Sequence, residues 1–197
     1  SFSLKFRLDS EAGNYTRLFQ FSPVAFGAGA SPSYSSPDIS VDLKDKKSFR
    51  TSIFAGNGST VENDDKHRAI FDLLTAPDSM EWHELTAVYM PADAQFYMDG
   101  NKLSTSDSDT LSDTMKSLFG EGVLPSYTYN SIGHSVYMDN DIRACVDDIR
   151  LYDYALSSSQ AAKLPNDPLY YYTFEEDTVK EGEAQPEEET TAAPDGT

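Results

Sequence analysis

The chain has 197 residues, of which 39% are hydrophobic and 12% aromatic, so it is long enough for one domain with a buried core and a tail. Its formal net charge of −18 argues against nucleic acid or an anionic membrane surface as a partner, because like charges repel one another. A single cysteine excludes an intrachain disulfide, and no apolar run is long enough to cross a bilayer. We therefore expect a soluble chain, without membrane insertion, whose export signal has been removed or left out.

The first half of the chain is built from short alternating segments. In Ser1–Leu8 every second residue is Phe or Leu, which is typical of a half-buried strand. Further strands are predicted, between clusters of Gly, Ser and Pro, at Arg17–Phe21, Ile39–Leu43, Ser48–Phe54 and Ala69–Leu73.

The middle of the chain predicts a hairpin with strands at Trp82–Met90 and Gln95–Asp99. Trp82 opens an apolar strand, so we expect its side chain in the core.

Two short helical segments complete the pattern. Residues Leu111, Met115 and Leu118 share one helix face within Thr110–Phe119, and Ser157–Leu164 indicates a last helical turn capped by its first residue. Short alternating strands, frequent turns and little helix predict an all-β, two-sheet antiparallel sandwich of jelly-roll type with peripheral helices.

A long strand precedes that last helical turn. With strict alternation, Asp147, Ile149 and Leu151 share one face, while Val146, Asp148, Arg150 and Tyr152 lie on the other. A carboxylate in register with two aliphatic residues needs a partner, because a buried unpaired charge is costly. Cys145, between Ala144 and Val146, is expected to be a small buried hydrophobic residue.

Two segments carry a family resemblance. Tyr129–Ser157 combines an Ile-Gly strand end, an acidic loop and a long strand that closes on Tyr-Ala-Leu-Ser. Glu81–Leu103 combines a Trp-His strand, a short turn and a Tyr-x-Asp-Gly hairpin. In this order they resemble bacterial laminin G-like domains of the concanavalin A-like lectin/glucanase superfamily, of the type often appended to secreted glycoside hydrolases. The matching material covers most of Ser1–Leu156, and the resemblance implies a structural, packed role for His83.

The C-terminal end departs from this family pattern. A strand of the kind that usually opens such domains, Leu169–Glu176, stands here near the C-terminus. We expect residues 168–178 to supply a closing strand to the same sandwich, in cis or in a strand-swapped partner chain. The alternative is that this strand begins a following module. The domain then spans 1–178, and the acidic Thr/Pro/Glu-rich residues 179–197 form a linker to other modules of the polypeptide.

A calcium site is implied by the same resemblance. Family members often hold one calcium ion where the first and last strands meet, which here corresponds to Asp147 with Glu175, helped by Asp177. Calcium prefers hard oxygen ligands, and such a site would be structural. The alternative is that Asp147 pairs with Arg143 or accepts hydrogen bonds from local backbone amides.

The candidate ligand site lies in the loops around the strand end at Ile132 and Gly133. Sugars present apolar ring faces and a fringe of hydroxyl groups, so they are bound by exposed aromatic rings beside hydrogen-bonding side chains. The residues of this kind are Tyr127, Tyr129, Asn130, His134, Tyr137, Asp139, Asn140 and Asp141, with Tyr34 from an earlier loop. The alternatives are packing for Tyr129 and Tyr137, and a solvated turn for the acidic residues.

A catalytic site is not predicted. The paired carboxylates that glycoside hydrolases place on one strand are absent, no nucleophile elbow is seen, and the three histidines have no metal-ligand spacing. We expect a non-catalytic carbohydrate-binding module of a larger secreted or cell-surface bacterial protein, with a polysaccharide or glycan as partner. The alternative is an adhesion, protein-interaction or architectural spacer domain of a surface protein.

Overall fold

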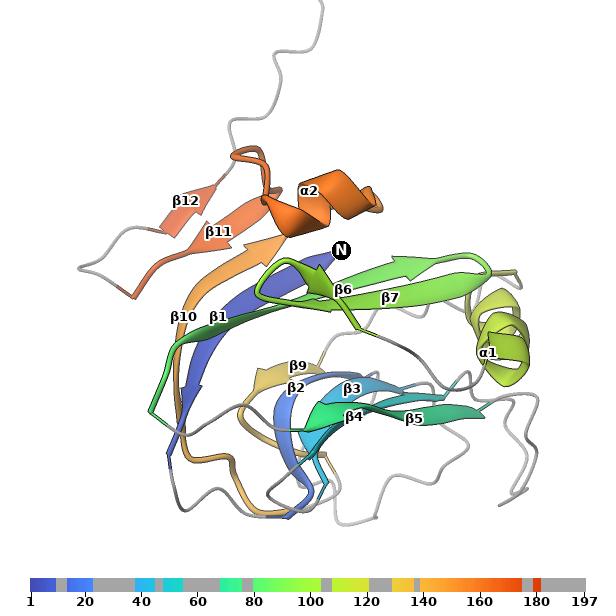
Figure 1. Ribbon diagram of the computed structural model, residues 1–197, viewed down its shortest axis with the longest axis horizontal. Coiled ribbons are helices and arrows are strands. Elements are labelled where there is room, and N and C mark those ends of the chain that lie inside the picture. Colours follow the sequence, from blue (N-terminus) through green and yellow to red (C-terminus); the bar gives the residue numbers. More distant parts are fainter. Residues whose placement is uncertain are drawn as a thin grey trace, which may run out of the picture.

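In the part of the chain that the structure describes, two antiparallel β-sheets pack face to face and two short helices lie at the periphery (Figure 1). The computed structural model describes residues 1–9, 14–22, 38–44, 48–54, 68–75, 80–103, 108–120, 129–136, 139–174 and 179–181. The two antiparallel sheets confirm the predicted sandwich.

Strands distant in the sequence are neighbours in both sheets. One sheet has seven strands within the described residues, in the order β12 (Val179–Glu181), β11 (Tyr170–Tyr172), β10 (Ala144–Leu151), β1 (Phe2–Leu8), β6 (His83–Met90), β7 (Asp93–Met98) and β8 (Asn101–Lys102). The other has five, in the order β5 (Arg68–Thr75), β4 (Ser48–Phe54), β3 (Asp38–Leu43), β2 (Thr16–Ser22) and β9 (Tyr129–Ile132).

The core lies between the two sheets and follows from the alternation in β1. Leu4 and Phe6 are fully buried, and the Phe6 ring meets Phe49 of β4 edge-on with 5.4 Å between ring centroids. Phe2 packs in the same way on Phe19 of β2, at 4.8 Å. Because side chains alternate between faces, every second residue of β1 contributes to the core and the others face outward.

The predicted hairpin is formed by β6 and β7. The Nδ1 atom of His83 lies 2.8 Å from Oδ2 of Asp99, and its ring lies beside Phe6, so His83 has the expected packed role. The turn that follows needs glycine, because Gly100 has a φ of 75°. A Cβ atom there would also lie 2.9 Å from the carbonyl oxygen of Ala162.

Both predicted helices are present. The helix α1 (Ser108–Gly120) buries Leu111, Met115 and Leu118, and it contacts β7 of one sheet and β5 of the other. It therefore closes one side of the sandwich (Figure 1). The helix α2 (Ser158–Ala162) begins with a capping box between Ser157 and Gln160, as the sequence indicates.

Strand β10 departs from the strict alternation that the sequence suggests. Its register against β1 shifts between the pairs Ser3↔Arg150 and Lys5↔Asp147, and Asp148 has a φ of 48°. This extra residue is a β-bulge, so the faces change at residue 148. Val146 therefore packs against the same core as Ile149, and the prediction that they lie on opposite faces was wrong.

The C-terminal segment adds a strand beside β10. Tyr172 pairs with Ile149 and Tyr170 with Leu151, antiparallel and within the same chain. In Figure 1, β11 and β12 extend beyond the five-stranded sheet. The rings of Tyr170 and Tyr172 stack with a centroid distance of 6.5 Å, and each remains 38% exposed. The domain limit at residue 178 and strand exchange with a second chain stay predictions.

Candidate functional site

The predicted ligand residues divide into three groups. Tyr34, Tyr127 and Tyr137 lie outside the described residues. Five side chains are exposed along β9 and the connection from β9 to β10: Tyr129, Asn130, His134, Asn140 and Asp141. His134 and Asp141 are paired through Nδ1 and Oδ1. These five side chains are therefore exposed to solvent, as a ligand-binding surface requires.

Asp139 has a structural environment instead. Its carboxylate lies 3.1 Å from the guanidinium of Arg17, which is nearly buried on β2. Arg17 also lies 3.7 Å from the fully buried Asp42, which in turn pairs with Arg50 at 2.9 Å. Two acids and two arginines thus form a network on the outer side of the five-stranded sheet. Asp139 anchors the β9–β10 connection to that network.

A second anchor holds the same connection. The backbone N–H of Val136 donates to Oε1 of Gln20 at 2.8 Å, while Nε2 of Gln20 donates to Asp38 at 2.9 Å. Gln20 is fully buried, so these hydrogen bonds are shielded from competing water. The connection is therefore fixed at Val136, which lies between His134 and Asp141 in the sequence.

The metal candidate Asp147 accepts backbone hydrogen bonds. Its Oδ1 atom receives the N–H of Asp148 at 2.8 Å and the N–H of Phe174 at 3.3 Å. Among the described residues, no three His, Cys, Asp or Glu side chains come together as a metal-binding group. Glu175 and Asp177 lie outside the described residues. The geometry matches amide capping of the bulge and leaves Oδ2 of Asp147 as the atom that calcium would use.

Asp148, which follows Asp147 and forms the bulge, interacts with a cation and a hydroxyl group. It forms an ion pair with Lys5 and accepts a hydrogen bond from the hydroxyl of Tyr171. Burial alone would raise the pKa of Asp148, but the hydrogen bonds from Lys5 and Tyr171, with the nearby positive charges, hold this pKa below its ordinary value. The hydrogen bond to Asp148 in turn raises the pKa of Tyr171.

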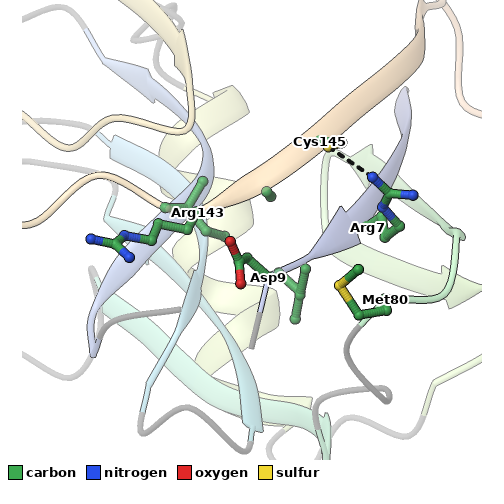
Figure 2. Close-up of a pocket in the computed structure, with 8 residues that line it drawn as sticks. Arg7, Asp9, Met80, Arg143 and Cys145 are labelled. Carbon is green, nitrogen blue, oxygen red and sulfur yellow. Dashed lines mark hydrogen bonds between the residues drawn. The ribbon is translucent and has the colours of Figure 1, made fainter. Parts of the chain in front are cut away.

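A pocket of about 400 Å³ lies where β1 ends and β10 begins. Its wall includes Arg7, Asp9, Met80, Arg143 and Cys145 (Figure 2). In the view of Figure 2 the two arginines lie on opposite sides, with Asp9 between them. The volume is within the range of small-molecule sites. Because residue 143 ends the β9–β10 connection, the pocket and the exposed residues of that connection belong to one end of the sandwich.

Two sequence expectations fail at this pocket. Trp82 is 47% exposed rather than in the core, and its ring lies 5.3 Å from the guanidinium carbon of Arg7. Cys145 is exposed rather than buried, and its Sγ accepts a hydrogen bond from Arg7 at 3.3 Å. Both side chains pack around Arg7, which the alternation of β1 places on the outer side of the sheet. That alternation was the signal that could have pointed to Arg7.

The comparisons with known proteins agree with this architecture. Residues 1–162 match the laminin G family model described as the concanavalin A-like lectin/glucanases superfamily. The chain belongs to this superfamily. No curated protein sequence matches the chain. None of the helices in the described part of the chain is both long and apolar enough to cross a membrane.

Two solved structures share the fold. A candidate carbohydrate-binding protein from Bacteroides ovatus is similar with a TM-score of 0.54 and 13% identity over 92% of this chain and 47% of that chain. The chain thus spans about half the length of that protein. The carbohydrate-binding domain, of type CBM40, of the Ruminococcus gnavus IT-sialidase, bound to α2,3-sialyllactose, has a TM-score of 0.52 and 9% identity over 82% of this chain and 79% of that domain.

Proposed function

We propose that the protein is a non-catalytic carbohydrate-binding module of a larger secreted or cell-surface bacterial protein. Its role is to hold a glycoside hydrolase, or the cell itself, close to a glycan. The similarity in fold to a candidate carbohydrate-binding protein and to a sialyllactose-bound domain supports this proposal. Fold alone does not define function, so the proposal depends on the site.

The single observation that carries the proposal is the pocket at the start of β10, whose lining residue Arg7 lies over the Trp82 ring. Met80 is 62% exposed and Trp82 is 47% exposed, so they offer apolar surface to a sugar ring. Arg7 and Asp9, which line the pocket, carry hydrogen-bond donors and acceptors suited to hydroxyl groups. An aromatic ring beside converging polar groups is the combination that sugar binding requires.

The exposed residues of the β9–β10 connection extend this surface. His134, Asn140 and Asp141 are exposed there and can contact hydroxyl groups of further sugar residues along a chain. Each contact of this kind is weak, and tethering to another module raises the effective concentration at the polysaccharide. Weak binding of a long glycan is therefore sufficient for the proposed role.

Affinity electrophoresis in gels that contain plant, host or microbial polysaccharides tests the proposal. We expect the wild-type protein to be retarded by at least one polysaccharide and Trp82→Ala to lose most of that retardation. Tyr172→Ala is the matched control, because it removes another exposed aromatic ring, on β11, that does not line the pocket. Tyr34→Ala and Tyr137→Ala test the residues that the sequence predicts. Absence of retardation by every polysaccharide, or full binding by Trp82→Ala, contradicts the proposal.

The exposed thiol of Cys145 provides a second test without any substitution. Because Cys145 lines the pocket and is exposed, a bulky maleimide should react with it in the folded protein and fill the pocket. We expect the labelled protein to lose glycan binding while its melting temperature stays the same. Cys145→Ser, treated in the same way, should keep its binding. A labelled protein that binds as well as the unlabelled one contradicts the assignment of the pocket.

A second candidate function is favoured by the exposed strip on β10 and β11. This strip comprises Leu151, Tyr170, Tyr172 and Phe174, and Phe174 is 65% exposed. It lies directly before the predicted linker, so the occupant that fits it is the neighbouring module of the same polypeptide, which the linker would hold nearby. The protein would then act as an architectural spacer.

The spacer function is tested by X-ray scattering on the larger polypeptide that contains this domain and its neighbouring module. The wild type is compared with Phe174→Ser. We expect the radius of gyration to increase when Phe174 is replaced, because the neighbouring module is released. An unchanged radius of gyration would contradict the spacer function. If the wild type also binds a glycan, carbohydrate binding is then the remaining function.

A further inference from the structure

The pocket contains an arginine, Arg7, in a strongly acidic chain. The chain has 33 acidic residues and only 15 Lys and Arg residues, so a cation has many acids with which to pair. Lys5, Lys44, Arg50 and Lys116 all lie within ion-pair distance of an aspartate. The guanidinium of Arg7 contacts the Cys145 sulfur and the Trp82 ring, and it has no carboxylate partner among the described residues.

The guanidinium of Arg7 is held in place before any ligand arrives. Arg7 and Cys145 are directly opposite each other in the β1–β10 ladder, so the hydrogen bond between them joins two fixed strands. The guanidinium also lies over the Trp82 ring, and this cation–π contact restricts its position. The sulfur accepts from one of the five N–H groups of the side chain, and other donors remain for a ligand. A pre-oriented side chain loses less entropy on binding.

The chemistry of a guanidinium selects the ligand. Its planar donors match a carboxylate in a two-pronged hydrogen bond that a hydroxyl group cannot reproduce. Arg143 also lines the pocket, but its guanidinium points away from Asp9 and Cys145 in Figure 2, so Arg7 is the cation that a carboxylate would meet there. The acidic surface elsewhere has little effect on Arg7, because salt screens charges over roughly 8 Å at physiological ionic strength.

We propose that the pocket selects glycans that carry a carboxylate, with Arg7 as the residue that reads it. This inference rests on the proposed carbohydrate-binding function and deepens it. The carboxylate of an acidic sugar lies against Arg7, while the apolar face of its ring lies on Trp82 and Met80. Arg143 has other interactions within the chain, so it is not assigned to the carboxylate.

The test compares one polymer in two forms. Binding of polygalacturonate and of the same polymer after full methyl esterification is measured by affinity electrophoresis, with sialyllactose and lactose as a soluble pair in calorimetry. Because charge-assisted hydrogen bonds are about twice as strong as neutral ones, we expect the acidic member of at least one pair to bind about tenfold tighter. Dextran sulfate tests whether any anion is enough, and binding of dextran sulfate as tight as that of the acidic sugars would overturn the inference.

Three variants separate the role of Arg7 from a general effect of charge. Arg7→Gln should bind the acidic and neutral members equally, with an unchanged melting temperature. Arg7→Lys keeps the charge without the planar fork, so part of the preference should return. Lys116→Gln removes an exposed cation on α1, 60% exposed, and should bind as the wild type does. A preference that persists in Arg7→Gln overturns the inference.

The outcomes also separate this inference from the proposed function. If the wild type binds acidic and neutral forms equally, carbohydrate binding stands and the selection of a carboxylate is wrong. If it binds no glycan of either kind, the proposed function fails, and the inference fails with it.

Discussion

The hydroxyl of Tyr171 on β11 donates a hydrogen bond to the carboxylate of Asp148 in the bulge of β10. The guanidinium of Arg150 lies over the same Tyr171 ring at 4.9 Å. These contacts connect the C-terminal strand to the sandwich by side chains, in addition to the backbone pairing of the two strands. The bulge and the added strand therefore depend on each other.

Tyr171→Phe tests this dependence, since it removes only the hydroxyl group. A hydrogen bond to a charged group contributes about 1.5–3 kcal/mol when buried, so we expect a loss of about 1–2 kcal/mol at this partly exposed site. For a chain of this size the melting temperature should fall by roughly 2–4 °C for each kcal/mol lost. Tyr170→Phe is the control, because the Tyr170 hydroxyl has no hydrogen bond to a described residue. Equal melting temperatures for the two variants would contradict the finding.

Removal of residues 168–178 tests whether the C-terminal strand belongs to this domain. The deletion exposes the edge of β10 and removes one donor from each carboxylate, the Phe174 N–H from Asp147 and the Tyr171 hydroxyl from Asp148. We expect the shortened protein to be cut faster by proteases within β10 and the β9–β10 connection, because exposed edges open locally. Unchanged resistance to proteolysis would show that the strand begins a separate module.

The pH dependence of stability should report the Lys5–Asp148 ion pair. The pKa of Asp148 lies below its ordinary value of 3.8, so its charge stabilises the fold above that pH. This contribution disappears as the pH falls through the lowered pKa of the folded state. We expect wild type to melt above Asp148→Asn at neutral pH, with a difference that shrinks below about pH 4. Asp113→Asn, in an exposed pair with Lys116, should show no such difference.

Much of the fold was predictable because it depends on local patterns. The alternation of Ser1–Leu8, the helix face of Leu111, Met115 and Leu118, and the cap at Ser157 are all contained in short segments. Each corresponds to an observed element within about two residues. Periodicity was sufficient where one side of an element is buried and the other faces solvent.

The features of the fold and the site that were not predicted depend on contacts between segments distant in the sequence. The periodicity of a segment carries no information about such contacts. The bulge at Asp148 adds one residue to the strand. Strict alternation therefore assigns the residues before the bulge, such as Val146, to the wrong face of the sheet. Trp82 was expected in the core because its strand is apolar, but it precedes the strand and lies on Arg7 instead. Asp139 was interpreted as a ligand residue, and its partner Arg17 is 122 positions earlier in the sequence.

The calcium site that the family resemblance implies can be separated from amide capping by two variants. Asp147→Asn keeps an oxygen that accepts the two backbone N–H groups but loses the charge, whereas Asp147→Ala loses both. We expect calcium at about 0.1–1 mM to raise the melting temperature of the wild type, and a chelator to reverse this. Asp147→Asn should no longer respond to calcium. An unchanged melting temperature of the wild type after chelation at low ionic strength would remove the calcium proposal.

Loss of Asp42 should be much more harmful than loss of an exposed acid on the same sheet. Asp42 is fully buried and pairs with both Arg17 and Arg50, so Asp42→Ala leaves two guanidinium groups without this partner. Breaking a buried pair from one side costs about 3–5 kcal/mol. Asp72→Ala is the control, because Asp72 is 56% exposed and pairs with Lys44, and such pairs contribute about 0–1 kcal/mol. The free energy of unfolding is measured by urea denaturation.

Since Arg17 also holds Asp139, Asp42→Ala should loosen the β9–β10 connection and weaken glycan binding as well. Similar stabilities for the two variants would show that the network does not anchor this loop.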